Sequence, residues 1–179
     1  NSPGLTTIIE NTPTRNHTEI LLRKIGAKIQ IKKLKKKKII KITGQKELKA
    51  KNISIAGDPS AASIIGSAAL ITPESEIKIM KVNINKTRTT FFNILKKMNA
   101  KIKISNKKRI SNEQIGDITF KSSNLKGVHL GKETVANMID EIPIFSVLAA
   151  FAKGNSSFRG GNELRNKESD RIKSLYEGL

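Results

Sequence analysis

The sequence predicts an α/β protein built from a repeated unit. Strand-like segments alternate with helix-like segments along the 179 residues. Residues 14–29 align without a gap with residues 87–102. In both copies a strand-like run comes before a Thr-Arg pair, an apolar-periodic helix follows, and a residue tolerant of left-handed geometry ends it. A third, looser copy begins at residue 156. Repetition at this scale indicates one supersecondary unit used several times.

The first copy opens with a strand at residues 6–9. The helix that follows carries its apolar side chains on one side, at Ile20, Leu21 and Ile25. Asn16 and Glu19 have the spacing of a capping box. Gly26 ends the helix, and a new strand begins directly after it.

A dense lysine run at residues 32–38 lies between strand-like segments and predicts a solvated hairpin turn. Strands are expected at residues 38–42 and 52–55. Asp58 then caps a helix with Pro59 in its first turn. The expected packing face of that helix consists of Ile64, Ile65, Ala68 and Ala69.

The second copy predicts strands at residues 77–81, 101–104 and 118–121. Its helix presents Phe91, Phe92, Leu95 and Met98, and ends at Asn99. Pro143 opens a further helix that ends near Gly154. The apolar residues of that helix are Ile144, Val147, Leu148 and Phe151.

Composition excludes several classes of protein. There is no cysteine, so the sequence excludes a disulfide framework and a thiolate nucleophile, and two histidines without cysteine argue against a zinc site. No apolar run reaches the ~18 residues that a membrane span needs, and no secretory leader pattern opens the chain. The expected location is cytoplasmic, with no membrane partner.

The net charge of +19 has two interpretations. One is a nucleic-acid partner, because clustered cations neutralise phosphates. The other is that lysine fills solvated positions throughout the chain. Arginine is scarce, and the chain has one tyrosine and no tryptophan, which leaves few stacking platforms for bases. We therefore expect no nucleic-acid partner.

Five short segments resemble one known family. Residues 165–171 (RNKESDR) and 139–143 (IDEIP) place cations, acids and a candidate general base near each other in the sequence. Residues 57–62 (GDPSAA), 85–89 (NKTRT) and 14–19 (TRNHTE) are the other three. Each motif is weak alone, but the five occur in the order and at the spacing of the EPSP synthase (3-phosphoshikimate 1-carboxyvinyltransferase) family. The chain resembles that family over nearly its whole length.

The resemblance implies the architecture of the enolpyruvyl transferases. That architecture has two globular domains of three βαβαββ units each, an inside-out α/β barrel arrangement with the active site between the domains. Residues 1–55 then correspond to the C-terminal part of the first domain and residues 56–60 to the crossover. Residues 61–179 correspond to the first two units and the start of the third unit of the second domain. On this map the architecture is incomplete, and we expect an internal fragment that is inactive by itself.

The resemblance also implies roles for five residues. Asp140 matches the catalytic proton acceptor at the 5-hydroxyl of shikimate 3-phosphate, although an aspartate at a helix start is otherwise a cap. Lys167 matches a catalytic lysine that touches both shikimate 3-phosphate and phosphoenolpyruvate. Glu168 matches a catalytic acid that exchanges a proton with phosphoenolpyruvate, and Arg171 matches a phosphoenolpyruvate ligand. Arg15 matches an arginine that binds shikimate 3-phosphate.

The residues around these five have structural interpretations. Without the resemblance, residues 165–171 would be a charged helix start capped by Ser169 or Asp170. Arg165 is expected to support its loop. Glu141 is expected to point away from Asp140 and either to be structural or to support the site residues without touching a substrate. Arg88 is the repeat equivalent of Arg15, and no catalytic role is implied for it.

The implied activity is transfer of the enolpyruvyl group of phosphoenolpyruvate to shikimate 3-phosphate, by a protein that is a monomer at full length. The resemblance implies no metal and no organic cofactor. Two alternatives remain. The related UDP-N-acetylglucosamine enolpyruvyl transferases usually carry a cysteine in a mobile loop, and this chain has none. The other alternative is a basic nucleic-acid-binding protein, which only the net charge supports.

Overall fold

The computed structural model describes residues 2–13, 15–35 and 37–179. Thr14 of the first Thr-Arg pair and Lys36 of the lysine run lie outside the described residues. The chain divides into two compact units, each of which is described by itself. Unit 1 comprises Asn1–Ile55 with Arg109–Glu113, and unit 2 comprises Ala56–Lys108 with Gln114–Leu179.

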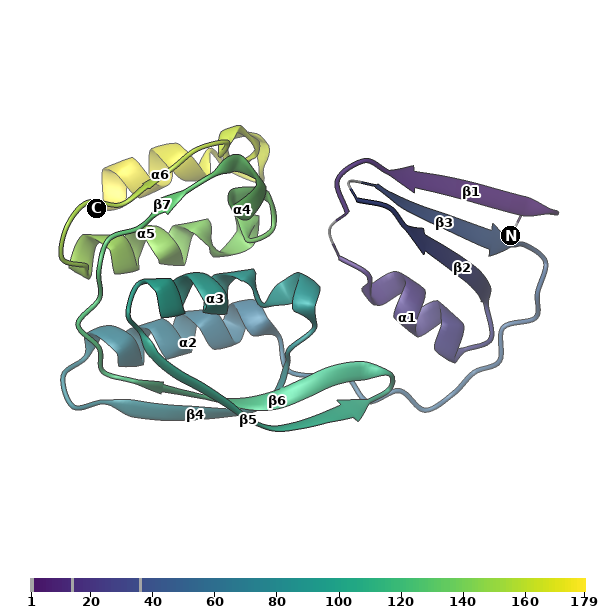
Figure 1. The fold of residues 1–179 in the computed structure, drawn as a ribbon, viewed down its shortest axis with the longest axis horizontal. Helices are drawn as coiled ribbons and strands as arrows, with labels where there is room; N and C mark the ends of the chain where they lie inside the picture. Colours follow the sequence, from purple (N-terminus) through teal and green to yellow (C-terminus); the bar gives the residue numbers. More distant parts are fainter. Residues whose placement is uncertain (1, 14, 36) are drawn as a thin grey trace. The chain divides into compact units, whose positions relative to one another are not determined.

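Unit 1 contains one helix and a three-stranded sheet (Figure 1). Its elements are β1 (Leu5–Glu10), α1 (His17–Lys24), β2 (Lys28–Lys33) and β3 (Lys38–Thr43). The strand order is β1-β3-β2, and β3 pairs antiparallel with both neighbours. Ile29 and Ile40 supply the buried apolar side chains of this sheet.

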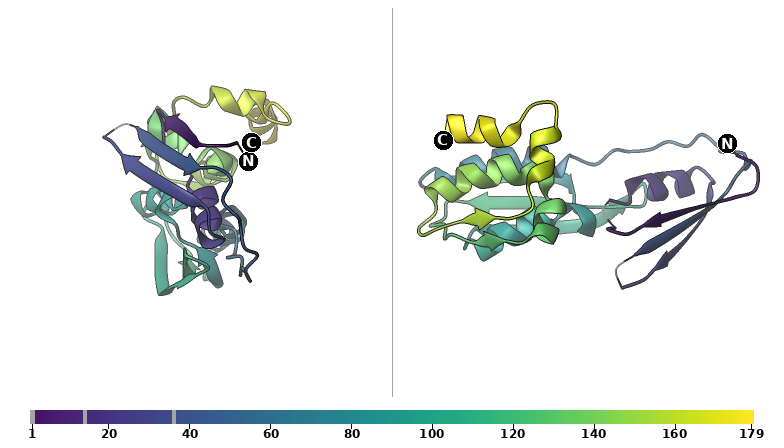
Figure 2. Two further views of the ribbon diagram at one scale, coloured as in Figure 1. Left: turned by 90° about the vertical axis from the view of Figure 1, so that its right-hand side faces the viewer. Right: turned by 90° about the horizontal axis from the view of Figure 1, so that it is seen from above.

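Unit 2 stacks helices on one face of a second three-stranded sheet (Figures 1 and 2). Its elements begin with α2 (Pro59–Ile71), β4 (Glu76–Asn83), the 3-10 turn η1 (Lys86–Arg88), α3 (Thr90–Lys97), β5 (Lys101–Ile110) and β6 (Glu113–Lys121). They continue with β7 (His129–Leu130), α4 (Lys132–Ala136), η2 (Ile139–Glu141), α5 (Ile142–Phe151), β8 (Ser157–Phe158), η3 (Asn162–Asn166) and α6 (Arg171–Gly178). Within the described ranges, no helix is both long enough and apolar enough to cross a membrane.

The core of unit 2 lies between the sheet and its helices. Helix α2 packs against β4 on one side and against α5 on the other, and α6 packs on α5. Phe92 from α3 meets Phe120 from β6 with ring centres 6.1 Å apart in an edge-on arrangement, and Phe91 lies beside Phe92 with ring centres 6.3 Å apart. The apolar face predicted for the second-copy helix is therefore confirmed, because Leu95 and Met98 are also fully buried.

The two units repeat the same topology, which confirms the predicted α/β class and the internal repeat. The strand order β1-β3-β2 of unit 1 corresponds to β4-β6-β5 of unit 2. In each, one helix joins the first strand to the second, and a hairpin joins the second to the third. Gly26 and Asn99 end the two equivalent helices with φ of +107° and +67°. Both residue types tolerate left-handed geometry, which is why the turn could be predicted.

The buried position of Lys38 contradicts two predictions about unit 1. The hairpin turn itself is confirmed, since the Leu34 N–H donates to the Lys37 carbonyl. Lys38 is not solvated, however: it is 4% exposed, and its Nζ lies 2.8 Å from Glu10 and 2.7 Å from Glu19. The prediction that Asn16 and Glu19 form a capping box is wrong, because both side chains fail to cap α1. Glu19 pairs with Lys38, and the side chain of Asn16 makes no cap hydrogen bond to α1.

One further expectation about secondary structure is wrong, and two about packing are wrong in part, since only Ala69 and Leu148 of the predicted faces are buried. Residues 52–55 form no strand, and Ile55 is 80% exposed. In α2 most of the buried residues are small, including Ala62, Gly66 and Ala69, and Leu70 is buried with them, whereas Ile64 and Ile65 are exposed. In α5 the fully buried residues are Ile142, Phe145 and Leu148, whereas Phe151 is exposed. Asp58 does cap α2 as predicted, and accepts hydrogen bonds from the backbone N–H groups of Ser60 and Ala61.

The buried carboxylate of Asp117 stabilises a register shift in the sheet of unit 2. The register of β4 against β6 shifts between Ile79 and Val82, and Lys81 has a φ of +55°. Asp117 accepts hydrogen bonds from the Asn106 side chain at 2.8 Å and from the Lys81 N–H at 3.1 Å, and pairs with Lys78. These donors lower the pKa of Asp117 from its ordinary value of 3.8 to about 2.

We expect Asp117 to give unit 2 an acid-dependent share of its stability. Because the folded pKa lies below the unfolded pKa, this share is present above pH 3.8 and is lost as the pH falls through about 2. The variant Asp117→Asn should therefore lower the urea midpoint at pH 5 and match the wild type near pH 2. Glu76→Gln is the control, because Glu76 forms an exposed ion pair with Lys121 on the same sheet. A deficit of Asp117→Asn that stays constant down to pH 2 would contradict this assignment.

Candidate active site

Three of the predicted site residues come together at one end of unit 2. Asp140 lies in the turn η2, Lys167 directly follows η3, and Arg171 is the first residue of α6. The Oδ1 atom of Asp140 is 4.0 Å from the Nζ of Lys167 and 3.9 Å from the Nη1 of Arg171. All three side chains are about one-third exposed, so they are held in place and still open to a ligand. We refer to Asp140, Lys167, Glu168 and Arg171 as the carboxylate–cation cluster.

The loop that carries Lys167 is held at both ends. Leu164 in η3 is completely buried and fixes the start of the loop. At the other end, Asp170 caps α6 by accepting a hydrogen bond from the Lys173 N–H. Arg165 donates to the same carboxylate of Asp170 at 2.9 Å. The structure thus confirms the predicted cap at Asp170 and the supporting role of Arg165.

The turn that carries Asp140 is also anchored by its neighbours. Met138 and Ile142 flank it and are buried, and Pro143 lies in the first turn of α5. Glu141, not Asp140, occupies the N-cap position of α5. The helix-cap interpretation of Asp140 therefore does not fit the structure, and the carboxylate faces two cations instead.

Glu168 is the most exposed member of the cluster. Its side chain is 81% exposed, and Oε2 accepts a hydrogen bond from the Nη2 of Arg171 at 2.9 Å. A hydrogen bond from its own backbone N–H and then the Arg171 guanidinium lower the pKa of Glu168 below its ordinary value of 4.5. Glu168 is therefore ionised at neutral pH and can accept a proton.

The cluster is suited to binding an anion and moving a proton. Lys167 and Arg171 offer an ammonium and a planar guanidinium, which together fit phosphate or carboxylate groups. Asp140 and Glu168 each provide a carboxylate for proton transfer. Among the residues that the structure describes, no group of three His, Asp or Glu side chains could hold a metal ion.

Arg15, the fifth predicted site residue, belongs to unit 1. It lies just before α1, and its backbone carbonyl accepts a hydrogen bond from Lys38 Nζ at 3.4 Å. The role of Arg15 in binding shikimate 3-phosphate stays a prediction.

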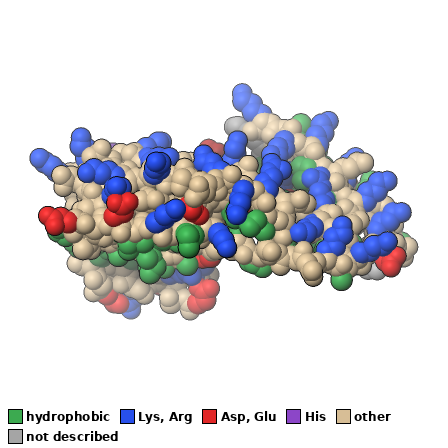
Figure 3. All heavy atoms as spheres, turned by 90° about the horizontal axis from the view of Figure 1, so that it is seen from below, with side chains coloured by type: hydrophobic (Ala, Val, Ile, Leu, Met, Phe, Trp, Pro, Cys, Tyr) green, Lys and Arg blue, Asp and Glu red, His purple; other side chains and the backbone are tan. Residues whose placement is uncertain are grey.

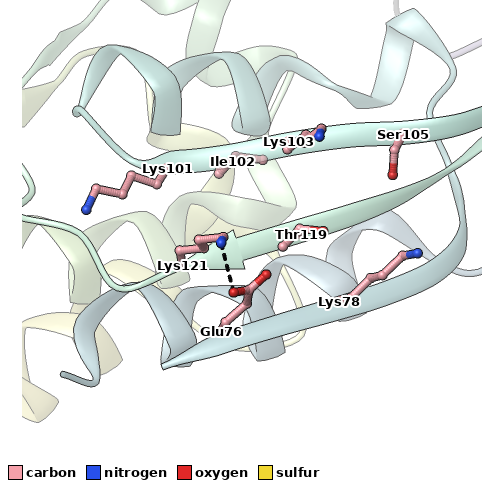
Figure 4. A pocket seen from close by; sticks show the side chains of 8 residues that line it. All are labelled: Glu76, Lys78, Lys101, Ile102, Lys103, Ser105, Thr119 and Lys121. Atoms are coloured by element: carbon pink, nitrogen blue, oxygen red, sulfur yellow. Dashed lines mark ion pairs between the residues drawn. The ribbon is translucent and has the colours of Figure 1, made fainter. Parts of the chain in front are cut away.

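A hollow of about 450 Å³ lies away from the cluster, on the face of sheet β4-β6-β5 opposite the helices (Figure 4). Its lining residues are Glu76, Lys78, Lys101, Ile102, Lys103, Ser105, Thr119 and Lys121. Two of the lysines are already paired, Lys121 with Glu76 and Lys78 with Asp117. Lys and Arg side chains are also numerous elsewhere on the face seen in Figure 3, so lysine alone does not distinguish this hollow. None of the predicted site residues lines it.

The sequence interpretation missed a second cluster, formed by Ser60, Arg88 and Glu141, which adjoins Asp140 through the η2 turn. It treated Ser60 as a capping and domain-crossover residue, Arg88 as a residue without a catalytic role, and Glu141 as a structural or supporting residue. The structure joins the three through hydrogen bonds and an ion pair. The only signal available in the sequence was that each lies in one of the five motifs.

Comparisons with known proteins agree on one family. The model of the EPSP synthase (3-phosphoshikimate 1-carboxyvinyltransferase) family matches residues 1–179. The 3-phosphoshikimate 1-carboxyvinyltransferase of Parvibaculum lavamentivorans is 42% identical over 100% of this chain and 40% of its own length. The protein of the same name from Bartonella quintana is 43% identical over 100% of this chain and 41% of its own length. The chain thus spans about 40% of the length of the curated relatives it matches.

Solved structures show the same likeness. An EPSP synthase from Acinetobacter baumannii superposes with a TM-score of 0.87 at 38% identity, covering 99% of this chain and 39% of that one. The enolpyruvyl transferase NikO from Streptomyces tendae superposes with a TM-score of 0.66 at 16% identity, over 88% of this chain and 36% of that one, and so shares the fold. The chain belongs to the EPSP synthase (3-phosphoshikimate 1-carboxyvinyltransferase) family.

Proposed function

We propose that these residues serve the transfer of the enolpyruvyl group of phosphoenolpyruvate to the 5-hydroxyl of shikimate 3-phosphate. The products are 5-enolpyruvylshikimate 3-phosphate and phosphate. The observation that carries the proposal is the position of Asp140 within 4.0 Å of both Lys167 and Arg171, in a chain of this family. A base and two cations at one place suit a reaction between two anionic substrates.

Asp140 is the proposed general base. The 5-hydroxyl oxygen forms a bond to C2 of phosphoenolpyruvate, and its proton passes to the carboxylate of Asp140. The methylene carbon gains a proton, which gives a tetrahedral intermediate. Loss of a proton from the resulting methyl group and cleavage of the C2–O bond to phosphate then restore the double bond. Because Asp140 is about one-third exposed, a substrate hydroxyl can reach it.

Lys167 and Arg171 are the proposed anion-binding groups. Lys167 lies beside Asp140 and can touch both substrates, as the resemblance implies. Arg171 offers a planar fork to the carboxylate or phosphate of phosphoenolpyruvate. Their present contacts with Asp140, at 4.0 and 3.9 Å, are longer than hydrogen bonds, so a bound anion can compete for both cations.

Glu168 is the proposed partner of the phosphoenolpyruvate methylene. The lowered pKa of Glu168 suits the elimination step, in which a carboxylate accepts a proton from the methyl group. The addition step needs the opposite protonation state. Arg171 is one of the groups that lower this pKa, so its transfer from Glu168 to a bound anion would raise the pKa and favour the protonated form.

The proposed function is tested by phosphate release from the complete protein that carries these residues. Release is expected only when phosphoenolpyruvate and shikimate 3-phosphate are both present. UDP-N-acetylglucosamine in place of shikimate 3-phosphate should give none, because the family model favours the shikimate reaction. Phosphate release with phosphoenolpyruvate and UDP-N-acetylglucosamine, but not with shikimate 3-phosphate, would show that the protein has the rival activity. The cytoplasmic location, the monomeric state and the absence of a nucleic-acid partner stay predictions of the sequence.

Arg15 and Arg88 provide a matched pair of substitutions, because they occupy equivalent positions in the repeat. We expect Arg15→Ala to weaken the binding of shikimate 3-phosphate by about 10- to 100-fold, the value of a charge-assisted hydrogen bond. We expect Arg88→Ala to leave that affinity nearly unchanged, since the Arg88 side chain is 10% exposed and already paired within unit 2. Calorimetric titration of both variants measures the difference. Equal losses of affinity would contradict the asymmetric assignment.

A further inference from the structure

Three of the five sequence motifs meet at one partly buried point of unit 2. Asp58 and Ser60, from residues 57–62, lie at the start of α2. Arg88, from residues 85–89, ends the turn η1. Glu141, from residues 139–143, ends the turn η2. None of these side chains has a part in the reaction proposed above.

The contacts among them form a continuous network. The Nη2 of Arg88 donates to the Ser60 Oγ at 2.7 Å and lies 3.3 Å from the Oδ1 of Asp58. The Ser60 hydroxyl in turn donates to the Oε1 of Glu141 at 2.5 Å. A serine hydroxyl has one donor and two acceptor positions, so it satisfies both partners at once. The same Arg88 atom is 3.7 Å from the Glu141 carboxylate.

Because the Glu141 and Arg88 side chains are largely buried, each depends on its partners in this network. The Glu141 side chain is 7% exposed and that of Arg88 is 10% exposed. A carboxylate at that depth is stable only with a cation and hydrogen-bond donors around it. The turn η1, which Arg88 ends, is stabilised by Asn85, whose side chain accepts hydrogen bonds from the Thr87 N–H and hydroxyl. The position of Glu141 is therefore determined from two other elements, α2 and η1.

Glu141 and the proposed base are consecutive residues of one three-residue turn. The Glu141 carboxylate reaches inward to Ser60 and Arg88, while the Asp140 carboxylate reaches Lys167 and Arg171. Any shift of the Glu141 backbone moves Asp140 with it, because the two share a peptide bond. A movement of about 1 Å at a reacting group is enough to cost roughly 10²-fold in rate.

We propose that Ser60, Arg88 and Glu141 are positioning residues, which hold the η2 turn so that Asp140 faces the substrate hydroxyl. The inference rests on the proposed function, since it assigns these residues an effect on the base of that reaction. They act through Asp140 and touch neither substrate. Their substitution should therefore lower kcat and leave the affinity for shikimate 3-phosphate nearly unchanged.

Three conservative variants test the network in the complete protein. Ser60→Ala removes the bridging hydroxyl, Glu141→Gln removes the charge but keeps an acceptor, and Arg88→Lys keeps the charge but loses the fork. Each should lower kcat by about 10- to 100-fold. Ser67→Ala is the matched control, because Ser67 lies in the same helix, is 1% exposed, and its hydroxyl has no hydrogen-bond partner among the described residues. It should retain the wild-type kcat. If Glu141→Gln fails to fold, the kcat of Ser60→Ala still tests whether the network positions Asp140.

A double-variant cycle separates positioning from general damage. If Ser60 acts through Asp140, Ser60→Ala should cost little further kcat once Asp140→Asn is present. Fully additive losses would show that the network is merely structural and would overturn the proposal.

Hydrogen exchange provides a readout that does not depend on turnover. The backbone amides of residues 139–142 should exchange faster in Ser60→Ala than in Ser67→Ala, because one anchor of the turn is gone. Unchanged exchange together with unchanged kcat would overturn the proposal while leaving the proposed function intact. A wild-type protein without turnover of shikimate 3-phosphate would instead remove the proposed function, and the positioning role with it.

Discussion

Asp140→Asn should lower the turnover of the complete protein by about 10²–10⁴-fold, the usual contribution of a general base. Asparagine has nearly the same shape, but its amide cannot take the proton of the 5-hydroxyl at neutral pH. Because the amide can still form a hydrogen bond with that hydroxyl, binding of shikimate 3-phosphate should change little. The kcat for phosphate release and the calorimetric Kd for shikimate 3-phosphate measure the two effects separately.

Asp170→Asn is the matched control for this substitution. Asp170 lies near the same cluster but caps α6, and asparagine is an equally good N-cap. Its partner Arg165 is more than half exposed, so the ion pair that is lost contributes little. We expect Asp170→Asn to keep most of the turnover. Near-normal turnover in Asp140→Asn would show that Asp140 is only a structural residue of its turn.

The members of the carboxylate–cation cluster could be predicted from sequence because they lie within two short motifs. Lys167, Glu168 and Arg171 occur within five residues of one another, and the order of the residues is enough to identify them. The network behind Asp140 could not be predicted in that way. Ser60 and Glu141 are 81 residues apart, and only the packing of α2 against η2 and α5 brings them together. Sequence spacing carries no information on such a contact.

Local signals also predicted the ends of helices better than their buried faces. The cap at Asp58 and the left-handed residue Asn99 depend on a few neighbouring residues, and both are confirmed. The buried face of α2 depends on its partner. A Cβ atom added to Gly66 would lie 2.5 Å from the Phe120 ring, so the sheet approaches α2 where the helix has its smallest side chains. The larger Ile64 and Ile65 are left outside.

The false strand at residues 52–55 has a similar cause. Its alternation of isoleucine with polar residues is typical of a half-buried strand. A strand also needs a partner for its backbone hydrogen bonds, and neither three-stranded sheet includes this segment. Alternation alone shows that a segment could enter a sheet, and it does not show that an edge is available to receive it.

Lys38→Met should destabilise unit 1 by about 3–5 kcal/mol, the usual cost of removing one partner from a buried ion pair. Methionine has nearly the volume of lysine, so packing is preserved, but Glu10 and Glu19 lose the cation between them. Burial lowers the pKa of Lys38, but the two carboxylates outweigh burial and raise the pKa above its ordinary value of 10.5. The ion pairs therefore contribute fully at neutral pH, and this contribution is lost only as the pH rises through the raised value.

Lys33→Met is the matched control, because Lys33 lies directly across from Lys38 in the β2–β3 hairpin and is exposed. Hydrogen exchange of the β3 amides at neutral pH measures the difference within unit 1. We expect exchange to accelerate about 10²- to 10⁴-fold in Lys38→Met, as its lost free energy implies, and to change little in Lys33→Met. The two lysines belong to one run of the sequence and differ only in what the fold places beside them. Equal exchange in the two variants would mean that Lys38 is as dispensable as the solvated lysines around it.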